Sequence, residues 1–524
     1  MRRMIWLLAT VLAACGSVQD RAGCAASADC PAGEYCAHTA DGNVCWPDGQ
    51  PPAVSDVTVA CGTCLRDGTV TVSAVVTDDH DVGAVEASLD LDPARTVPLT
   101  LSGGRWTARV PLGAWPFPAF ARPVRATVVA RDGARNASAP ASADSPAVTR
   151  LRWQRAVDGV VVALTPPAIM DDGTIVVGGS TGKLYFVSPT GVNAHDPLPV
   201  GTGQITAAPA IGQRAIWVGS EDFSIYGVKL DGSGVIPGVS VASDGPIRVS
   251  LAVVDQPAEE WAFGASTGGR IAGASTQANT AKTGITNGYT SGPVIGPSGI
   301  VFAANANPVA AGLLRSYGFD GAFTDRWGNA TPSVGMTVLA TPAVDAAGDV
   351  LTGSQDGKLV RVDPAGAVIS VCDLSGSAVD SIVILSKGDF VVGDITGLLY
   401  RFSPGGTPLW TPEPQLGGAV LSPLVIAGST QAFIVPTKAG SVFALTDAGA
   451  EVWHATLGSG AELRTGNLFT PPGQAAGQLL SEAIFSSADG KLYDVIVDGQ
   501  LDPAAPWPKA FHDRRNTSNA GTRP

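Results

Sequence analysis

The chain has 524 residues, of which 45% are hydrophobic and 15% are charged, and its formal net charge is −13 at pH 7. This acidic balance argues against a nucleic-acid partner, because the phosphates of nucleic acids attract basic surfaces. Glycine and proline are unusually frequent, with 64 and 39 residues, and the apolar fraction is ample for a core, so we expect many short strands joined by tight turns.

The chain starts with a predicted signal peptide, residues 1–14. Two arginines precede an apolar stretch that ends at Ala14, directly before Cys15. A helix of about ten residues extends about 15 Å, which is half of a hydrocarbon core of about 30 Å, so this stretch is too short to span a bilayer. The sequence Leu-Ala-Ala-Cys-Gly resembles the bacterial lipobox. The resemblance implies cleavage before Cys15 and a diacylglycerol thioether on its sulfur; an ordinary secretory signal with a chance cysteine is the alternative.

Lipidation of Cys15 predicts a protein held at a membrane surface, because two or three acyl chains suffice for stable anchoring. Residue 16 is glycine and not aspartate. By resemblance to the usual lipoprotein sorting rule, this favours the outer membrane. We therefore expect an outer-membrane lipoprotein of the cell envelope, on the periplasmic face or the cell surface, with residues 15–23 as a tether.

A Cys-rich module is predicted at residues 24–45. An exported chain meets an oxidising compartment, so two disulfides are the default for its four cysteines, and zinc ligation is the alternative. Four cysteines allow three pairings, and we favour first with third and second with fourth. Such modules resemble those that precede larger domains in many secreted myxobacterial proteins. The four cysteines are Cys24, Cys30, Cys36 and Cys45.

A Pro-rich linker, residues 46–52, leads into a segment of alternating apolar residues, 53–147. About six such strands in under 100 residues are typical of an immunoglobulin-like sandwich, and phrases such as ATVVARDGARNAS resemble bacterial Ig-like modules. Cys61 and Cys64 match a redox CxxC, but no thioredoxin-like pattern surrounds them, so we expect a structural disulfide. The acids of the loop at 78–81 are interpreted as turn residues, with Ca²⁺ binding by Asp78, Asp79 and Asp81 as the alternative.

From residue 151 to 524 one strand-glycine-strand phrase recurs, as in TIVVGGSTGKLYFV and DVLTGSQDGKLVRV. Its equivalent positions lie between 40 and 50 residues apart. Periods of this length with several strands each indicate the blades of a β-propeller, here eight of them. The eight equivalent positions are Gly182, Phe223, Gly269, Gly312, Gly357, Gly397, Gly440 and Gly490. The predicted fold class is therefore all-β.

These blades resemble the pyrroloquinoline-quinone (PQQ) type repeat, with a Trp expected on the outer strand at Trp327, Trp410 and Trp453. The late phrase WPKAFHDRRNTSNAG resembles a tail or lead phrase of such proteins. Two functional branches share the repeat. One comprises quinone dehydrogenases, and the other comprises non-catalytic propellers such as the lipoprotein subunit of the outer-membrane barrel-assembly machinery.

The residues that the enzyme branch requires are not recognisable. Quinone dehydrogenases need Ca²⁺ ligands, a catalytic Asp and, in many members, adjacent cysteines, whereas Cys372 is the single cysteine of the repeat region. No His spacing typical of metal sites and no P-loop occurs. We therefore predict no catalytic residue, no metal and no cofactor, with PQQ and Ca²⁺ disfavoured.

The spacing of the tryptophans predicts how the ring closes. Trp153 precedes a Thr-Pro pair at 165–166 by 12 residues, as Trp410 precedes Ser-Pro at 422–423. Residues 151–156 are thus an outer strand without a preceding blade. Because an unpaired edge strand is a liability, we expect them to pair with the last copy, near residues 491–497.

The sequence as a whole favours a lipid-anchored envelope propeller that acts as a non-catalytic scaffold for a protein or a polysaccharide. A quinone-dependent oxidoreductase or a glycan-active enzyme that uses the propeller funnel is the alternative, because a site assembled from distant blades leaves no local motif.

Overall fold

The computed structural model describes residues 23–523 except 41, 160–161, 278, 283–287, 289–290, 298, 308–309, 319–321, 329–331, 339, 379 and 475–478. Two compact units divide the chain. Unit 1 comprises residues 1–64, 68–116 and 122–148, and unit 2 comprises 65–67, 117–121 and 149–524. The described residues form strands and two short 3-10 helices, η1 (Ser27–Asp29) and η2 (Leu112–Ala114). Over this part of the chain, no helix is long and apolar enough to cross a membrane.

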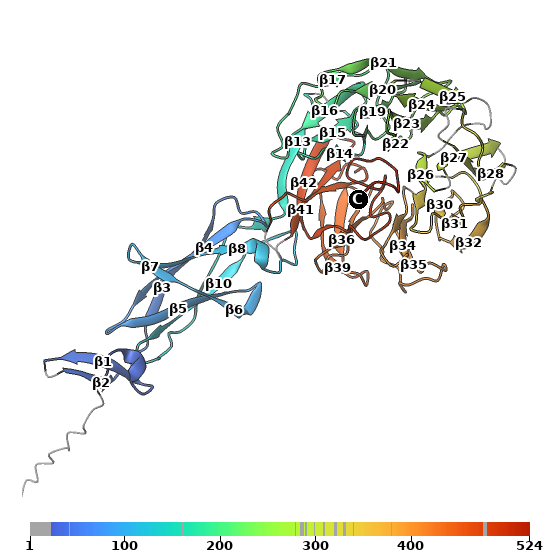
Figure 1. Cartoon of the computed structure of the whole chain (residues 1–524). Helices are drawn as coiled ribbons and strands as arrows, with labels where there is room; N and C mark the ends of the chain where they lie inside the picture. The colour runs from blue at the N-terminus through green and yellow to red at the C-terminus, as the bar shows by residue number, and fades with distance from the viewer. Residues whose placement is uncertain are drawn as a thin grey trace, which may run out of the picture. The chain divides into compact units, whose positions relative to one another are not determined.

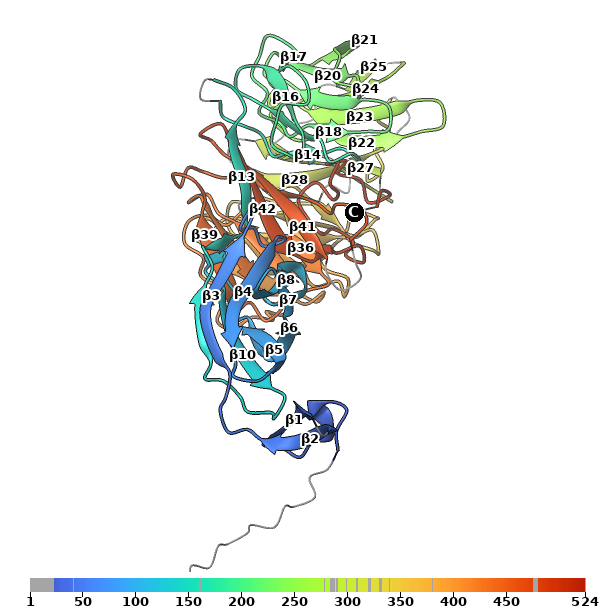
Figure 2. The ribbon, with the colours of Figure 1, turned by 90° about the vertical axis from the view of Figure 1, so that its left-hand side faces the viewer.

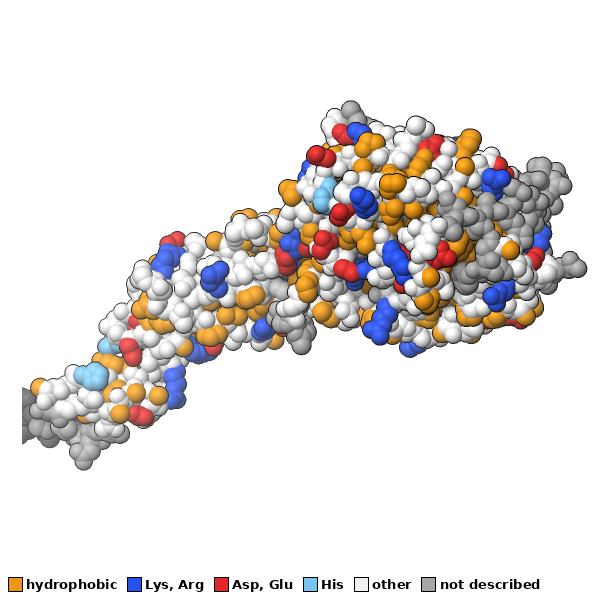
Figure 3. All heavy atoms as spheres, turned by 45° about the horizontal axis from the view of Figure 1, so that its top comes forward, with side chains coloured by type: hydrophobic (Ala, Val, Ile, Leu, Met, Phe, Trp, Pro, Cys, Tyr) orange, Lys and Arg blue, Asp and Glu red, His pale blue; other side chains and the backbone are white. Residues whose placement is uncertain are grey.

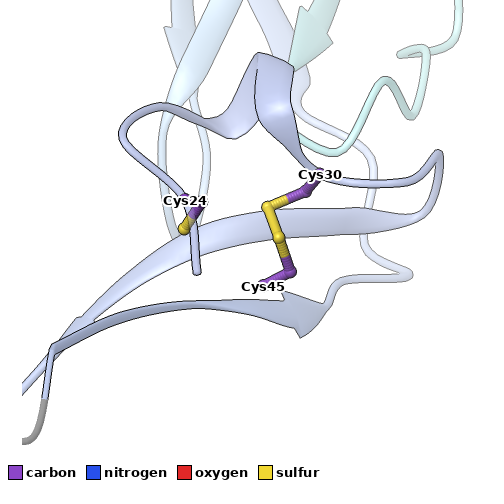
Figure 4. Close-up of side chains that lie close together, drawn as sticks. All are labelled: Cys24, Cys30 and Cys45. Atoms are coloured by element: carbon purple, nitrogen blue, oxygen red, sulfur yellow. A yellow bond between two sulfur atoms is a disulfide. The ribbon is translucent and has the colours of Figure 1, made fainter. Parts of the chain in front are cut away.

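The Cys-rich module of unit 1 is an antiparallel pair, β1 (Glu34–Thr39) and β2 (Gly42–Pro47). One disulfide joins Cys24 to Cys36 and a second joins Cys30 to Cys45. This is the first-to-third and second-to-fourth pairing. In Figure 4 the Cys30–Cys45 bond lies between η1 and the sheet, with Cys24 beside it. Since the sulfurs are bonded to one another, they are not thiolate ligands for zinc.

The remainder of unit 1 is a sandwich of two four-stranded sheets that contact each other face to face. Alternate residues of β4 and β10 point into the core, where Val72 and Val128 are fully buried. This is the alternation that the sequence shows; the immunoglobulin-like class stays a prediction. The first sheet has β11 (Ala141–Asp144), β10 (Arg125–Asp132), β5 (Val82–Leu89) and β6 (Asp92–Pro98), and the second has β3 (Ala53–Cys61), β4 (Thr69–Thr77), β8 (Arg105–Pro111) and β7 (Thr100–Ser102). A third disulfide links Cys61 to Cys64 after β3.

Unit 2 consists of consecutive antiparallel sheets arranged around a centre at which the C-terminus lies (Figure 1). This arrangement is a β-propeller, and each sheet is called a blade below. The strands of each blade are given from the innermost to the outermost. Blade 1 consists of β14 (Ala168–Ile169), β15 (Ile175–Gly178), β16 (Lys183–Val187) and β17 (Leu198–Pro199), and blade 2 of β18 (Ala210–Ile211), β19 (Ile216–Gly219), β20 (Ser224–Val228) and β21 (Val235–Ala242). Blade 3 consists of β22 (Ala252–Asp255), β23 (Glu260–Ala265), β24 (Ile271–Ser275) and β25 (Asn279–Lys282), and blade 4 of β26 (Val294–Gly296), β27 (Gly299–Asn307) and β28 (Ala310–Tyr317).

The later blades repeat this order. Blade 5 consists of β29 (Ala343–Val344), β30 (Val350–Gly353), β31 (Lys358–Val362) and β32 (Val368–Asp373), and blade 6 of β33 (Val383–Ile384), β34 (Phe390–Gly393) and β35 (Leu399–Phe402). Blade 7 consists of β36 (Leu424–Ala427), β37 (Phe433–Pro436), β38 (Ser441–Leu445) and β39 (Glu451–Thr456), and β43 (Gln500–Leu501) pairs with the inner strand β36. Blade 8 consists of β40 (Asn467–Phe469), β41 (Leu480–Ser486), β42 (Lys491–Asp498) and β13 (Leu151–Ala156). The two-residue strands β9 (Ala121–Arg122) and β12 (Val148–Thr149) pair with each other.

The glycine that recurs between the second and third strands of a blade sits in a left-handed turn. The predicted equivalence was wrong for Gly312, which lies within the third strand, β28, of blade 4. Gly182 has φ 75°, and a Cβ there would lie 2.7 Å from the carbonyl oxygen of Gly203. Phe223 holds the equivalent place in blade 2 and adopts φ 73° without being a glycine. The weaker repeat copy therefore keeps the turn geometry of the stronger ones.

The ring closes as predicted. The N-terminal strand β13 pairs antiparallel with β42, from Leu151 opposite Val495 to Ala156 opposite Lys491. Figures 1 and 2 both show β13 lying along β42. Blade 8 thus takes its outermost strand from the start of unit 2 and its other three from the end.

Indole rings link successive blades. The Nε1–H groups of Trp153, Trp327 and Trp410 donate to the carbonyl oxygens of Pro189, Pro364 and Asp447, at 2.9, 3.0 and 3.2 Å. Each acceptor lies in the turn after the third strand of the following blade. Trp453 lies on the outer strand β39 as expected, whereas Trp327 and Trp410 follow β28 and β35 outside any strand. The outer-strand prediction was wrong for these two, because their sheets end at β28 and β35 and are followed by isolated bridges, Tyr317 with Asp325 and Phe402 with Pro408.

Candidate binding face at the centre of the ring

Residues 502–523, called the axial segment here, run through the centre of unit 2 along the inner strands of the blades. Backbone hydrogen bonds join this segment to β14, β18, β22, β26, β33 and β36. The pairs, donor first, are Ile169–Arg514, Ile211–Arg515, Val253–Thr517, Ile295–Ser518, Ile384–Trp507 and Val425–Pro508, with N···O distances of 2.7 to 2.9 Å.

These hydrogen bonds satisfy backbone N–H groups of the inner strands that would otherwise point toward the centre of the ring without partners. An inner strand has a neighbour on one side only, and buried backbone N–H groups need an acceptor. Side chains of the segment add to the backbone contacts: the Asn516 amide donates to the carbonyls of Pro167 and Pro209 at 3.0 and 3.3 Å, and the Asn519 amide donates to Val253 at 2.9 Å. The segment is therefore a built part of the fold.

A buried lysine holds the segment's own turn. Lys509 Nζ donates to the carbonyl oxygens of Ala510 and Asp513 and to Asn516 Oδ1, at 2.6, 2.9 and 2.8 Å. Burial lowers the pKa of Lys509 to about 7, against a smaller opposing effect of Asp513 and Asp380. At physiological pH, both the protonated and the neutral form of the Lys509 amine are therefore populated.

Asp513 is the acidic counterpart of this cluster. Burial by itself raises the pKa of Asp513, but the His512 ring and hydrogen bonds from the hydroxyls of Thr517 and Thr522 outweigh burial and lower it. The His512 ring also packs against Trp507, with ring centroids 4.8 Å apart. This carboxylate thus organises the end of the segment, and its contacts lie within the segment itself.

Two cavities open where the axial segment meets the turns between first and second strands. The first, about 610 Å³, is lined mainly by apolar residues that include Ile295, Pro297, Val344 and Ala504. The second, about 600 Å³, is lined by charged residues described below. Both cavities are lined by Gly521 and Thr522, so they are adjacent. Together they form what we call the axial face.

Charges of both signs meet in the second cavity. Arg514 and Arg515 both pair with Asp171, and these hydrogen bonds lower the pKa of Asp171 although partial burial opposes them. Glu260 is fully buried nearby; it accepts from Trp217 Nε1 at 2.6 Å and from backbone N–H groups at 213–215. Burial raises the pKa of Glu260, and those donors oppose the rise.

The residues that the sequence singled out lie elsewhere. Cys15 is outside the described residues, and the six module and loop cysteines are paired in disulfides. Cys372 is a buried free thiol, and burial followed by the charge of Asp373 raises its pKa. On the face of unit 2 shown in Figure 3, acidic and basic side chains are interspersed with apolar ones and do not form a patch of one sign.

Sequence reasoning missed the axial segment as a structural element. The phrase WPKAFHDRRNTSNAG was noticed but not placed, because it has no alternation of apolar residues. The available signal was its run of small polar residues at 516–519, Asn-Thr-Ser-Asn, whose amide and hydroxyl groups can satisfy a crowded set of backbone groups.

No family model matches the sequence, and no curated protein is significantly similar to it. Among solved structures, BamB from Moraxella catarrhalis is 14% identical, with 66% of this chain and 98% of that chain covered and a TM-score of 0.51. Sqt1 from Saccharomyces cerevisiae is 10% identical, with 66% and 97% covered and a TM-score of 0.53. Both are β-propellers, and at these identities the likeness shows the fold alone.

Proposed function

We propose that this protein is a lipid-anchored scaffold of the cell envelope that binds a protein or polymer at the axial face. The observation that carries the proposal is the axial segment. In this chain the space between the inner strands is taken by residues 502–523, hydrogen-bonded to six blades. What the segment leaves open is a surface with two adjacent cavities.

The lining of these cavities suits a polymer segment. An apolar cavity next to one that holds both Arg515 and Asp255 offers burial for apolar side chains and partners for polar ones. Protein interfaces combine these two features. BamB-like propellers support the scaffold at the level of the fold. The enzyme alternative ranks second because the axial segment fills the place in which a funnel enzyme would hold its cofactor.

Site-specific photo-crosslinking in intact cells tests the binding face. A photoreactive residue is placed at Gln213 or Ala346, which are exposed and line the second and the first cavity. The matched controls are Thr181, in an exposed turn at the opposite end of a blade, and Ile369, exposed on the outer strand β32. We expect a discrete adduct from the first two positions only. Equal adducts at all four positions, or none, would count against the axial face.

The anchor has its own test. Metabolic labelling with a fatty acid should mark the protein, and Cys15→Ser should abolish both the label and the membrane association. An unchanged membrane fraction for Cys15→Ser would refute the lipid anchor and leave the binding face untouched. Addition of PQQ and Ca²⁺ to the purified protein should give no dye reduction; a positive assay would reverse the ranking of scaffold and enzyme.

A further inference from the structure

A cluster of metal-ligating side chains lies in unit 1, away from the axial face. Asp48 follows β2 in the linker, and Asp78, Asp79 and His80 form the loop between β4 and β5. One ligand atom from each of these four side chains lies within 4.8 Å of the others. The linker and the loop are far apart in sequence but belong to the same compact unit.

Two carboxylate oxygens of the cluster are buried without a hydrogen-bond donor. The side chain of Asp48 is 2% exposed; its Oδ1 accepts from the N–H of Gln50 at 2.9 Å, while no donor reaches its Oδ2. Asp78 Oδ1 is likewise buried and without a donor. An unpartnered buried carboxylate oxygen costs free energy, so the cluster requires a cationic partner.

A protonated His80 does not meet this requirement. Its Nδ1 lies 3.4 Å from Asp48 Oδ2 and 3.1 Å from Asp79 Oδ1. One Nδ1–H points at a single acceptor and supplies one charge against three carboxylates. These distances instead match the edges of a tetrahedron, which are about 3.4 Å when metal–ligand bonds are about 2.0 to 2.2 Å.

We propose that Asp48, Asp78, Asp79 and His80 form a site for a divalent first-row transition-metal cation, with Zn²⁺ as the best match. An imidazole among carboxylates suits Zn²⁺, whereas Ca²⁺ and Mg²⁺ take oxygen ligands. Asp81, which a Ca²⁺ interpretation of the loop includes, is directed elsewhere, since its oxygens accept from Ser27 and Gly133. The Tyr35 ring of β1 packs against the His80 ring, with centroids 4.0 Å apart, and positions it. A bound cation therefore fastens the linker after the Cys-rich module to the sandwich loop.

Calorimetric titration of the full-length protein tests the site. The protein is purified in detergent without a polyhistidine tag, stripped with a chelator and titrated with ZnCl₂, with CaCl₂ and MgCl₂ in parallel. We expect one Zn²⁺ per chain, a Tm that rises with Zn²⁺, and affinity that falls at least about tenfold in Asp48→Asn and in His80→Gln. His38→Gln is the matched control, because His38 is exposed in the same module and hydrogen-bonds to Asn43 outside the cluster. This variant should bind Zn²⁺ as the parent does.

Three results overturn the proposal. The first is the absence of Zn²⁺ binding, and the second is Zn²⁺ binding that neither Asp48→Asn nor His80→Gln weakens. The third is Ca²⁺ binding that His80→Gln leaves unchanged, because that indicates a site of oxygen ligands only. If Asp48→Asn does not fold by circular dichroism, His80→Gln decides the outcome, since its side chain is 30% exposed and its loss leaves no large cavity.

Discussion

The Cys-rich module and the propeller ring hold short strands together by opposite means. In the module, the buried apolar cluster consists of Cys30, Cys36 and Cys45, and two disulfides connect its parts. In unit 2, the described cysteine is the free Cys372, and apolar clusters run from each blade to its neighbour, as between blades 1 and 2. A segment as small as the module buries too little surface to fold without cross-links.

This difference shows where long-range order comes from in each region. The module depends on bonds between residues 12 and 15 positions apart. The ring depends on contacts between its two ends, such as β13 with β42. We therefore expect the module to open locally when its bonds are cut, and the ring to respond as a whole when its closure is damaged.

The largest effect is expected from Asp498→Ala, at the end of β42, the strand that pairs with β13. Asp498 accepts from fully buried Arg150 at 2.9 and 3.1 Å and from Arg66 at 3.1 Å. Removing it leaves a buried guanidinium without its carboxylate, which costs about 3–5 kcal/mol. Chemical denaturation followed by tryptophan fluorescence measures the loss. Asp447→Ala is the control: its side chain is 75% exposed beside Arg401, so its loss should cost less than about 1 kcal/mol. Equal losses of unfolding free energy in the two variants would show that the buried ion pairs of Asp498 contribute no more to stability than an exposed pair does.

The next largest effect belongs to the module. Replacing Cys30 and Cys45 by serine removes the bond that spans 15 residues, which should destabilise the module by about 2–4 kcal/mol. Hydrogen exchange should rise in β1 and β2 and stay unchanged in the ring. Serine at Cys61 and Cys64 is the matched comparison, with a smaller expected effect because that bond spans 3 residues. Faster exchange throughout the ring would contradict the separation of the two regions.

The elements that sequence predicted best are those whose signal repeats. The strand-glycine-strand phrase placed the second and third strands of the blades, and even Phe223 keeps the left-handed turn. The closing strand was predicted because Trp153 has the same spacing to its Thr-Pro pair as Trp410 has to its Ser-Pro pair. In each case one copy of the repeat serves as a reference for another.

The axial face and the metal cluster had no such reference. Asn516 contacts Pro209, which is 307 residues away, and nothing near either residue indicates the other. Asp48 and His80 each look like a turn residue, and only folding brings them within 3.4 Å. Each of these sites is built from segments that are unrelated in sequence and occur once in the chain. Such segments leave no periodic pattern, so the sites are visible only in the tertiary structure.

A smaller, pH-dependent effect is expected at the axial segment. The pKa of Lys509 is about 7 in the folded protein and ordinarily near 10.5, so the unfolded chain holds its proton over this range while the folded chain does not. Folding stability therefore rises as pH increases from about 7 toward 10.5 and loses this contribution as pH falls. Lys509→Met cannot titrate, so its Tm relative to the parent should decrease by a few degrees between pH 7 and pH 9.5. A constant difference in calorimetric scans would show that Lys509 titrates normally.

An effect of opposite sign is expected at Asp494 on β42 in blade 8. Asp494 is fully buried on β42, and neither of its oxygens has a hydrogen-bond donor. Arg152 Nε lies 3.3 Å from Asp494 Oδ2 and equally far from Glu482 Oε1. The same guanidinium also pairs with Asp67, so it serves three carboxylates. Burial first, and the charge of Glu482 second, raise the pKa of Asp494 well above its ordinary value.

The sign of this effect follows from which state holds the proton. Folded Asp494 keeps its proton to higher pH than the unfolded chain does, so its contribution to stability is complete at acidic pH and is lost as pH rises through the folded pKa. Asp494→Asn cannot ionise and should gain stability relative to the parent between pH 4 and pH 8. Asp373→Asn, whose parent side chain is 77% exposed, should show no such trend. If Asp494→Asn instead loses stability toward pH 8, the ion pair with Arg152 outweighs burial, and the closing blade is held by charge as well as by strand pairing.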